Sequence, residues 1–198
     1  MECSNGYCSL SGISSWTAYR GVRFFKSDLQ GVCDSLSYTT PDSIMRMHVA
    51  PVLWSDSNQV TAEHIQMRIT NNGPESLLLE SASFICSQQD SIRFNQISGK
   101  RMDGFFVDGE LVSVKVSGNG QSVYYTEDSK GALTGVNNAE CSDMLIQLDG
   151  RKVSGITLIN EPDATLYPIK ELPPSELLLK GFKWLQSQRP LSRQDIFH

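Results

Sequence analysis

One pattern of apolar residues recurs along the chain and constrains the fold more than any other feature. An aromatic or thiol residue is followed eight positions later by a small or apolar residue, and this happens at Phe25 and Cys33, Trp54 and Ala62, and Cys86 and Phe94. Further apolar residues follow three and, in most copies, five positions later. The second halves begin at residues 33, 62, 94 and 141, so the spacings are 29, 32 and 47 residues. Such a repeat indicates stacked equivalent units, none of which buries its apolar face alone.

The shape of one unit follows from the alternation of its apolar residues. Val60 and Ala62 alternate, as do Ile65 and Met67, but the phase slips by one residue between the two pairs. Successive side chains of a strand point to opposite faces, so a slip reverses the buried face unless a bulge or corner absorbs it. We expect corners at residues 34–35, 63–64, 95–96 and 142–143. Four bent strands predict an all-β, curled structure of two layers.

Composition excludes several functional classes. The 198 residues are 39% hydrophobic and 20% charged, with a net charge of −5 and no basic run, so we expect no nucleic-acid partner. No stretch approaches the roughly 18 apolar residues of a membrane helix, so we do not expect an integral membrane protein. Residues 1–15 lack the basic region and apolar core of a secretory signal. We therefore expect either a cytosolic chain or one whose signal is missing from this sequence.

The sequence offers little for catalysis or metal binding. Cys33, Cys86 and Cys141 take repeat positions otherwise held by apolar residues, which predicts buried, unpaired thiols. Cys3 and Cys8 either bridge each other or stay unpaired. No CxxC is present and the chain has 3 histidines, so we expect no zinc site and no cofactor. Because GxSxG, HExxH and P-loop motifs are also missing, we expect no enzyme.

The organisation of the chain predicts one domain with two flanking segments. Residues 1–17 have no period and form an unassigned lead-in. Residues 18–170 carry the strands, separated by turn sequences such as Asp108–Gly109. Residues 171–198 form a short C-terminal helix and tail. A helix start is indicated by Pro174 and Glu176, after which Leu178, Phe182 and Leu185 would share one helix face.

Several segments of the chain resemble the OstA-like proteins of Gram-negative bacteria, which are relatives of the LptA periplasmic bridge. The segments that carry the resemblance are residues 18–36, 49–56, 90–97, 118–125, 138–143, 162–168 and 180–184. They occur in the family's order, and the match covers residues 18–198. The resemblance implies a slit, V-shaped β-jelly roll in the periplasm whose groove shields the acyl chains of lipopolysaccharide. It also implies open sheet edges at which copies or other bridge proteins join by β-strand augmentation, and no catalytic residues.

The bent strands supply the side chains for such a groove. We expect the inner face to bind lipid through Leu36, Tyr38, Val60, Ala62, Ile65, Met67, Ile92, Phe94, Ile97, Met144 and Ile146. Each buried CH₂ of an acyl chain contributes about 0.8 kcal/mol, so binding needs no specific polar contact. The alternative is a scaffold with a closed core that binds proteins rather than lipid. The sequence leaves open the lipid species, the number of copies and whether the C-terminal helix caps the roll.

Overall fold

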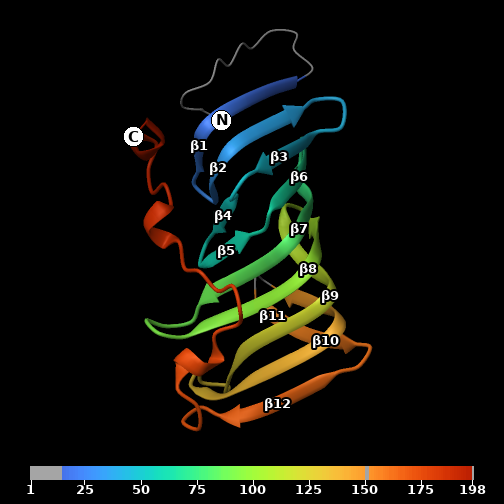
Figure 1. Cartoon of the computed structure of the whole chain (residues 1–198), viewed down its shortest axis with the longest axis vertical. Helices are drawn as coiled ribbons and strands as arrows, with labels where there is room; N and C mark the ends of the chain where they lie inside the picture. The colour runs from blue at the N-terminus through green and yellow to red at the C-terminus, as the bar shows by residue number, and fades with distance from the viewer. Residues whose placement is uncertain (1–14, 150–151, 198) are drawn as a thin grey trace.

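The computed structural model describes residues 15–149 and 152–197, which form a single 12-stranded antiparallel sheet (Figure 1). The strands are β1 (Ser15–Lys26), β2 (Leu29–Thr39), β3 (Ile44–His48), β4 (Val52–Ser55), β5 (Asn58–Thr61), β6 (His64–Thr70), β7 (Gly73–Gln88), β8 (Phe94–Val107), β9 (Glu110–Glu127), β10 (Leu133–Asp149), β11 (Lys152–Ile159) and β12 (Asp163–Pro168). Three short 3-10 helices follow, η1 (Pro174–Leu177), η2 (Gln186–Gln188) and η3 (Gln194–Phe197). None of the helices in these ranges is long and apolar enough to span a membrane.

The sheet folds into two layers because its long strands bend near their middles. The first half of β7 pairs with β6 and its second half with β5. In the same way β10 pairs with β12 through its first half and with β11 through its second half. The layer that contains β3, β6 and β11 is called the upper layer here, and the layer that contains β4, β5 and β12 the lower layer. This arrangement confirms the predicted all-β roll of bent strands.

The corners between the layers combine register shifts with left-handed backbone conformations. Ser81 and Ala82 in β7 have φ angles of 63° and 50°, and β9 bends at Gly118 and Asn119 with 79° and 53°. Their neighbours β2, β6 and β10 turn at the predicted corners 34–35, 63–64 and 142–143. The predicted corner at 95–96 is wrong, because these residues lie inside β8 and its register shift falls between Ser98 and Arg101.

This shift corrects the third copy of the repeat. One row of directly paired side chains crosses the upper layer, and it contains Ala18, Leu36, Met47, Ile65, Leu79, Met102, Val116 and Met144. All eight are at most 1% exposed. In β8 the row holds Met102 and not Ile97, so the third copy begins at Gly99. Cross-strand pairing decides which residues of β8 face inward. Phe94 and Ile97 have the same three-residue spacing as the inward-facing residues of the other copies, which is why the sequence pattern was misleading here.

The chain between β3 and β4 gives a prediction for stability. Val49 has a φ of 60°, a left-handed conformation that is strained for a β-branched residue. Its side chain is 62% exposed, so it contributes little buried apolar surface. We expect Val49→Gly to raise the free energy of unfolding by about 0.5–1 kcal/mol in a urea titration. Ile92→Gly is the matched control, because Ile92 is 57% exposed without a left-handed φ. The explanation is contradicted if both substitutions destabilise the protein equally.

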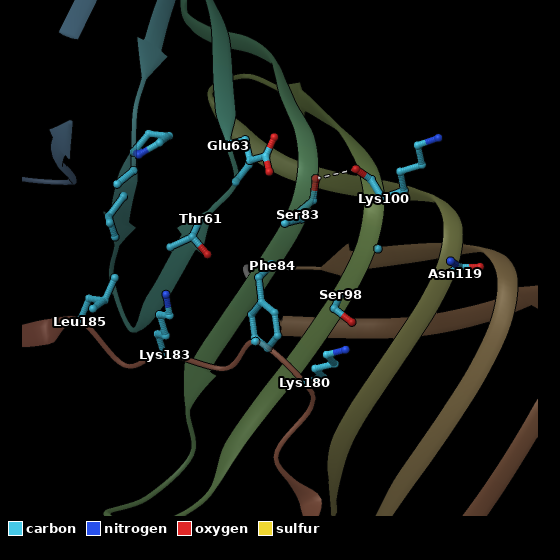
Figure 2. Close-up of a pocket in the computed structure, with 17 residues that line it drawn as sticks. Thr61, Glu63, Ser83, Phe84, Ser98, Lys100, Asn119, Lys180, Lys183 and Leu185 are labelled. Carbon is cyan, nitrogen blue, oxygen red and sulfur yellow. Dashed lines mark hydrogen bonds between the residues drawn. The ribbon is translucent and has the colours of Figure 1, made fainter. Parts of the chain in front are cut away.

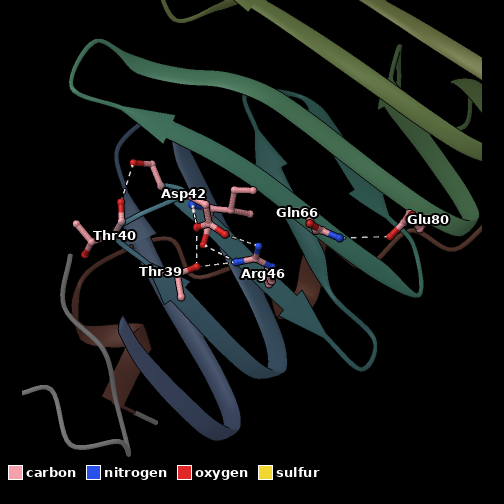
Figure 3. Close-up of polar contacts among 8 residues, drawn as sticks. Thr39, Thr40, Asp42, Arg46, Gln66 and Glu80 are labelled. Atoms are coloured by element: carbon pink, nitrogen blue, oxygen red, sulfur yellow. Dashed lines mark hydrogen bonds and ion pairs between the residues drawn. The ribbon is translucent and has the colours of Figure 1, made fainter. Parts of the chain in front are cut away.

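A polar network closes the β2–β3 hairpin at its turn (Figure 3). Arg46 donates through its two terminal nitrogens to Thr39 Oγ1 at 2.8 Å and to Asp42 Oδ2 at 2.6 Å. Thr39 also donates to Asp42 Oδ1 at 2.6 Å. The hydrogen bond from Arg46 is the main reason why the pKa of Asp42 lies well below its ordinary value. The network is therefore present above the ordinary pKa of an aspartate and is lost only in strong acid.

The C-terminal segment is an extended strap and not a continuous helix. Its first turn, η1, begins at the predicted position, but residues 178–185 are not helical. Gly181 has a φ of 92°, which breaks any helix there. The strap, defined as residues 174–197, runs from the β12 end of the sheet across the outer face of the lower layer to β1 (Figure 1).

Candidate functional site

The space between the two layers is the candidate site, and it holds nine of the eleven side chains predicted to bind lipid. Leu36, Ile65, Met67, Met144 and Ile146 are buried there, with exposures of 0–4%. Tyr38, Val60, Ala62 and Ile97 are partly buried against the same cluster. Most of the residues that the sequence predicted to face inward therefore do so.

The other two predicted residues do not belong to the interior. Ile92 lies in the β7–β8 turn and is 57% exposed. Phe94 lies on the opposite face of β8 from Ile97, and its ring centroid is 5.0 Å from those of Phe182 and Trp184 in the strap. The placement of Phe94 follows from the misassigned register of β8, because an odd shift reverses the buried face, whereas Ile92 lies before the strand begins.

The chemistry of the interior suits hydrocarbon. No described ionisable carboxylate, amine or guanidinium group is buried in it. Five of the 6 methionines of the chain line it, namely Met45, Met47, Met67, Met102 and Met144. Methionine is unbranched and polarizable, so such an interior can adapt to neighbours of different shape. Within the described residues no group of three or more His, Cys, Asp and Glu could hold a metal ion.

The interior opens at the β11–β12 edge of the sheet. A cavity of about 310 Å³ lies there between the two layers. Tyr124 and Asn137 line it from the lower layer, and Val153, Ile156 and Leu158 line it from β11. Leu166 of β12 pairs with Asn137 and is 63% exposed. This opening is called the mouth, and sequence reasoning missed it because its residues lie outside the repeat.

Three buried glutamines fix the strap on the outer face of the lower layer. Gln96 accepts from Leu179 N at 2.9 Å and donates to Leu177 O at 3.1 Å. Gln59 accepts from Leu185 N at 2.7 Å and donates to Lys183 O at 2.6 Å. These side chains replace the hydrogen bonds that a strand partner would supply to the strap backbone. Sequence reasoning missed them because the partners lie 81 to 126 positions apart.

The third glutamine holds the far end of the strap. Gln30 Oε1 accepts from Arg189 Nε at 2.8 Å and from Arg189 Nη2 at 2.6 Å. Arg189 also donates to Asp56 O at 2.8 Å. The strap is thus attached to β2, β5 and β8 on the outer face of the lower layer.

The buried thiols give a test of how tightly the interior and the strap are packed. Cys33, Cys86 and Cys141 are unpaired and buried, as predicted. Burial raises the pKa of Cys86 from 9.0 to about 12, and burial together with the charge of Asp34 does the same for Cys33. Between about pH 9 and 12 these thiols lose their protons in the unfolded state but keep them in the folded state. The free energy of unfolding therefore falls as the pH rises through this range.

We expect these thiols to resist maleimide at mildly alkaline pH in a Cys3→Ser, Cys8→Ser background. The thiolate is the reactive form, and a pKa of about 12 in place of 9.0 lowers its fraction about a thousandfold for Cys33 and Cys86. Burial also raises the pKa of Cys141 above its ordinary value. Mass spectrometry should show no label on the folded protein and three labels in urea. Rapid labelling of the folded protein would contradict this packing.

Comparison with known proteins addresses the fold. No protein-family model matches the sequence, and no curated protein does. A solved structure that matches is LptH of Pseudomonas aeruginosa, described as the LptA homologous periplasmic component of the conserved lipopolysaccharide transport device. The match has a TM-score of 0.53 and 13% sequence identity, and covers 72% of this chain and 100% of that chain. This chain therefore has the fold of the LptA-like proteins.

Proposed function

We propose that the protein is a non-enzymatic, periplasmic carrier of lipopolysaccharide that holds lipid acyl chains between its two layers. The observation that carries this proposal is the uncharged, methionine-lined interior that opens at the mouth. An acyl chain that enters past Ile156 and Leu158 would meet the apolar side chains of the upper layer, such as Met144 and Ile146, while polar Asn137 lies on the lower side of the mouth. About 0.8 kcal/mol is gained for each CH₂ removed from water, so one long chain supplies the affinity needed.

Loading requires that the layers separate, because the centre of the interior is filled by the protein's own side chains. The eight-residue row from Ala18 to Met144 is at most 1% exposed. Flexible methionines can move aside with little strain, which allows a chain to advance from the mouth inward. The phosphorylated head group of the lipid would remain outside the interior, in contact with water.

The sheet edges supply a way to join a bridge. Among the described residues β11 and β12 pair only with β10, and β1 pairs only with β2. An edge strand offers unpaired N–H and C=O groups to the strand of another protein. A copy or a transport-bridge partner that docks at β11 and β12 would extend the interior directly from the mouth.

The filled centre favours a second candidate, a scaffold that binds proteins and carries no lipid. Photo-crosslinking separates the two functions. A photoreactive residue at Ile156 or Leu158 should capture lipid A, whereas the same residue at exposed Lys115 or at Phe94 beneath the strap should not. Equal capture from all four positions, or none from the mouth, would favour the scaffold.

A further inference from the structure

A second cavity lies outside the interior, where the strap passes the corners of the lower layer (Figure 2). Its volume is about 560 Å³, which is within the range of small-molecule sites. Thr61 of β5, Phe84 of β7 and Ser98 of β8 line it from the sheet, and strap residues line another side. Because the strap forms one wall, the site exists only when the strap is docked.

The strap presents two lysines to this cavity through a fixed arrangement. The section between the Gln96 and Gln59 contacts contains Lys180, Gly181, Phe182 and Lys183. Phe182 and the following Trp184 pack against Phe94. Lys183 lies between these two aromatic residues and lines the cavity instead, as does Lys180 before the left-handed Gly181.

The charge of the cavity is opposite to that of the protein. Lys100, Lys180 and Lys183 line it against the single acidic residue Glu63, although the chain carries a net charge of −5. None of the three ammonium groups forms an ion pair with another described residue. In Figure 2, Lys183 extends toward Thr61 and Lys180 lies on the Ser98 side, whereas Lys100 extends away. Lys180 and Lys183 are therefore the cations that a ligand would meet.

The remaining lining is mostly apolar. Val52, Ala62, Phe84 and Leu185 contribute to it, and the hydroxyl groups of Thr61 and Ser98 add polar groups beside the lysines. Ammonium and hydroxyl groups donate hydrogen bonds to anionic oxygens, while the apolar surface suits a hydrocarbon body. We propose that this cavity binds an anionic amphiphile, that is, a phosphate or carboxylate group carried on an alkyl chain. The proposal does not depend on lipid entering the interior.

The test uses the full chain and calorimetric titration with octyl phosphate, octanoate and the neutral octyl glucoside below their micelle concentrations. We expect the two anions to bind and the glucoside to bind at least about tenfold more weakly. Lys180→Gln with Lys183→Gln should weaken anion binding about tenfold or more, and high salt should weaken it in the wild type. Lys115→Glu is the control, because exposed Lys115 of β9 lies outside the cavity.

Each result decides the proposal. Preference for either anion with loss in the lysine variant supports it, and competition by inorganic phosphate would assign the phosphate group as the recognised part. Leu158→Glu, at the mouth, should leave this binding unchanged, which separates the site from the interior. Equal binding of octyl glucoside, or anion binding that survives both lysine substitutions, would overturn the proposal.

Discussion

Removal of residues 174–198 should destabilise the protein by at least about 5 kcal/mol, which is enough to unfold a typical domain. The strap buries Leu177 and Ile196 to 4% and 2% exposure and covers a cluster with Val123, Tyr125 and Val136. Each fully buried large apolar side chain contributes about 1.5–3 kcal/mol, and both sides of the contact would become exposed. Urea titration of the shortened and full chains measures the difference.

A milder substitution keeps this prediction testable if the shortened chain does not fold. Gln59→Met preserves the shape of the side chain but leaves Lys183 O and Leu185 N without their partner, so it should cost about 2–4 kcal/mol. Gln66→Met is the control, because Gln66 makes one bond of 3.3 Å, to Glu80, and should cost less than about 1 kcal/mol. Equal losses from both substitutions would contradict a special role for the strap contacts.

Leu158→Glu should abolish binding of lipid A while leaving the fold intact. Leu158 lies at the mouth and is only partly buried, so a carboxylate there can reach water in the empty protein. An acyl chain beside it would desolvate the charge, which costs several kcal/mol and weakens binding by more than about a hundredfold. Photo-crosslinking of lipid A to a photoreactive residue at Ile156, which lines the mouth, measures the effect. Ile159→Glu is the control, because the neighbouring Ile159 is exposed and points to the other face of β11.

The bends and the buried face could be predicted from sequence because they depend on local alternation. One corner separates Ala62 from Ile65 and Met67, so the change of phase in the apolar pattern is visible within six residues. The Asp108–Gly109 turn was equally local, and both residues adopt the left-handed conformation that such a hairpin needs. Three of the four corners were therefore placed correctly.

The register of β8 and the strap could not be predicted because they depend on distant residues. Phe94 looks like an inward-facing residue until Phe182 and Trp184 are known to cover its ring on the outer face. The pattern of Leu178, Phe182 and Leu185 is typical of a helix, but Gln96 and Gln59 take the backbone groups on either side of Gly181. Tertiary hydrogen bonds thus override a local preference.

The two faces of the lower layer have separate tasks in this account. The inner face contributes to the interior, and the outer face carries the strap and the lysine-lined cavity. The strap is attached at β2, β5 and β8, so these hydrogen bonds hold it to the lower layer alone. Under the proposed function, the upper layer would move away from the lower one to admit an acyl chain.

Native mass spectrometry of the full chain mixed with lipid A tests the central claim most directly, because it reports bound lipid and copy number in one spectrum. In a Lys180→Gln, Lys183→Gln background, which removes the proposed outer site, we expect a bound lipid that is lost on adding Leu158→Glu and retained on adding Ile159→Glu. A spectrum of lipid-free protein at excess lipid A, or an adduct of equal intensity in all three proteins, would contradict the proposal that the interior holds acyl chains.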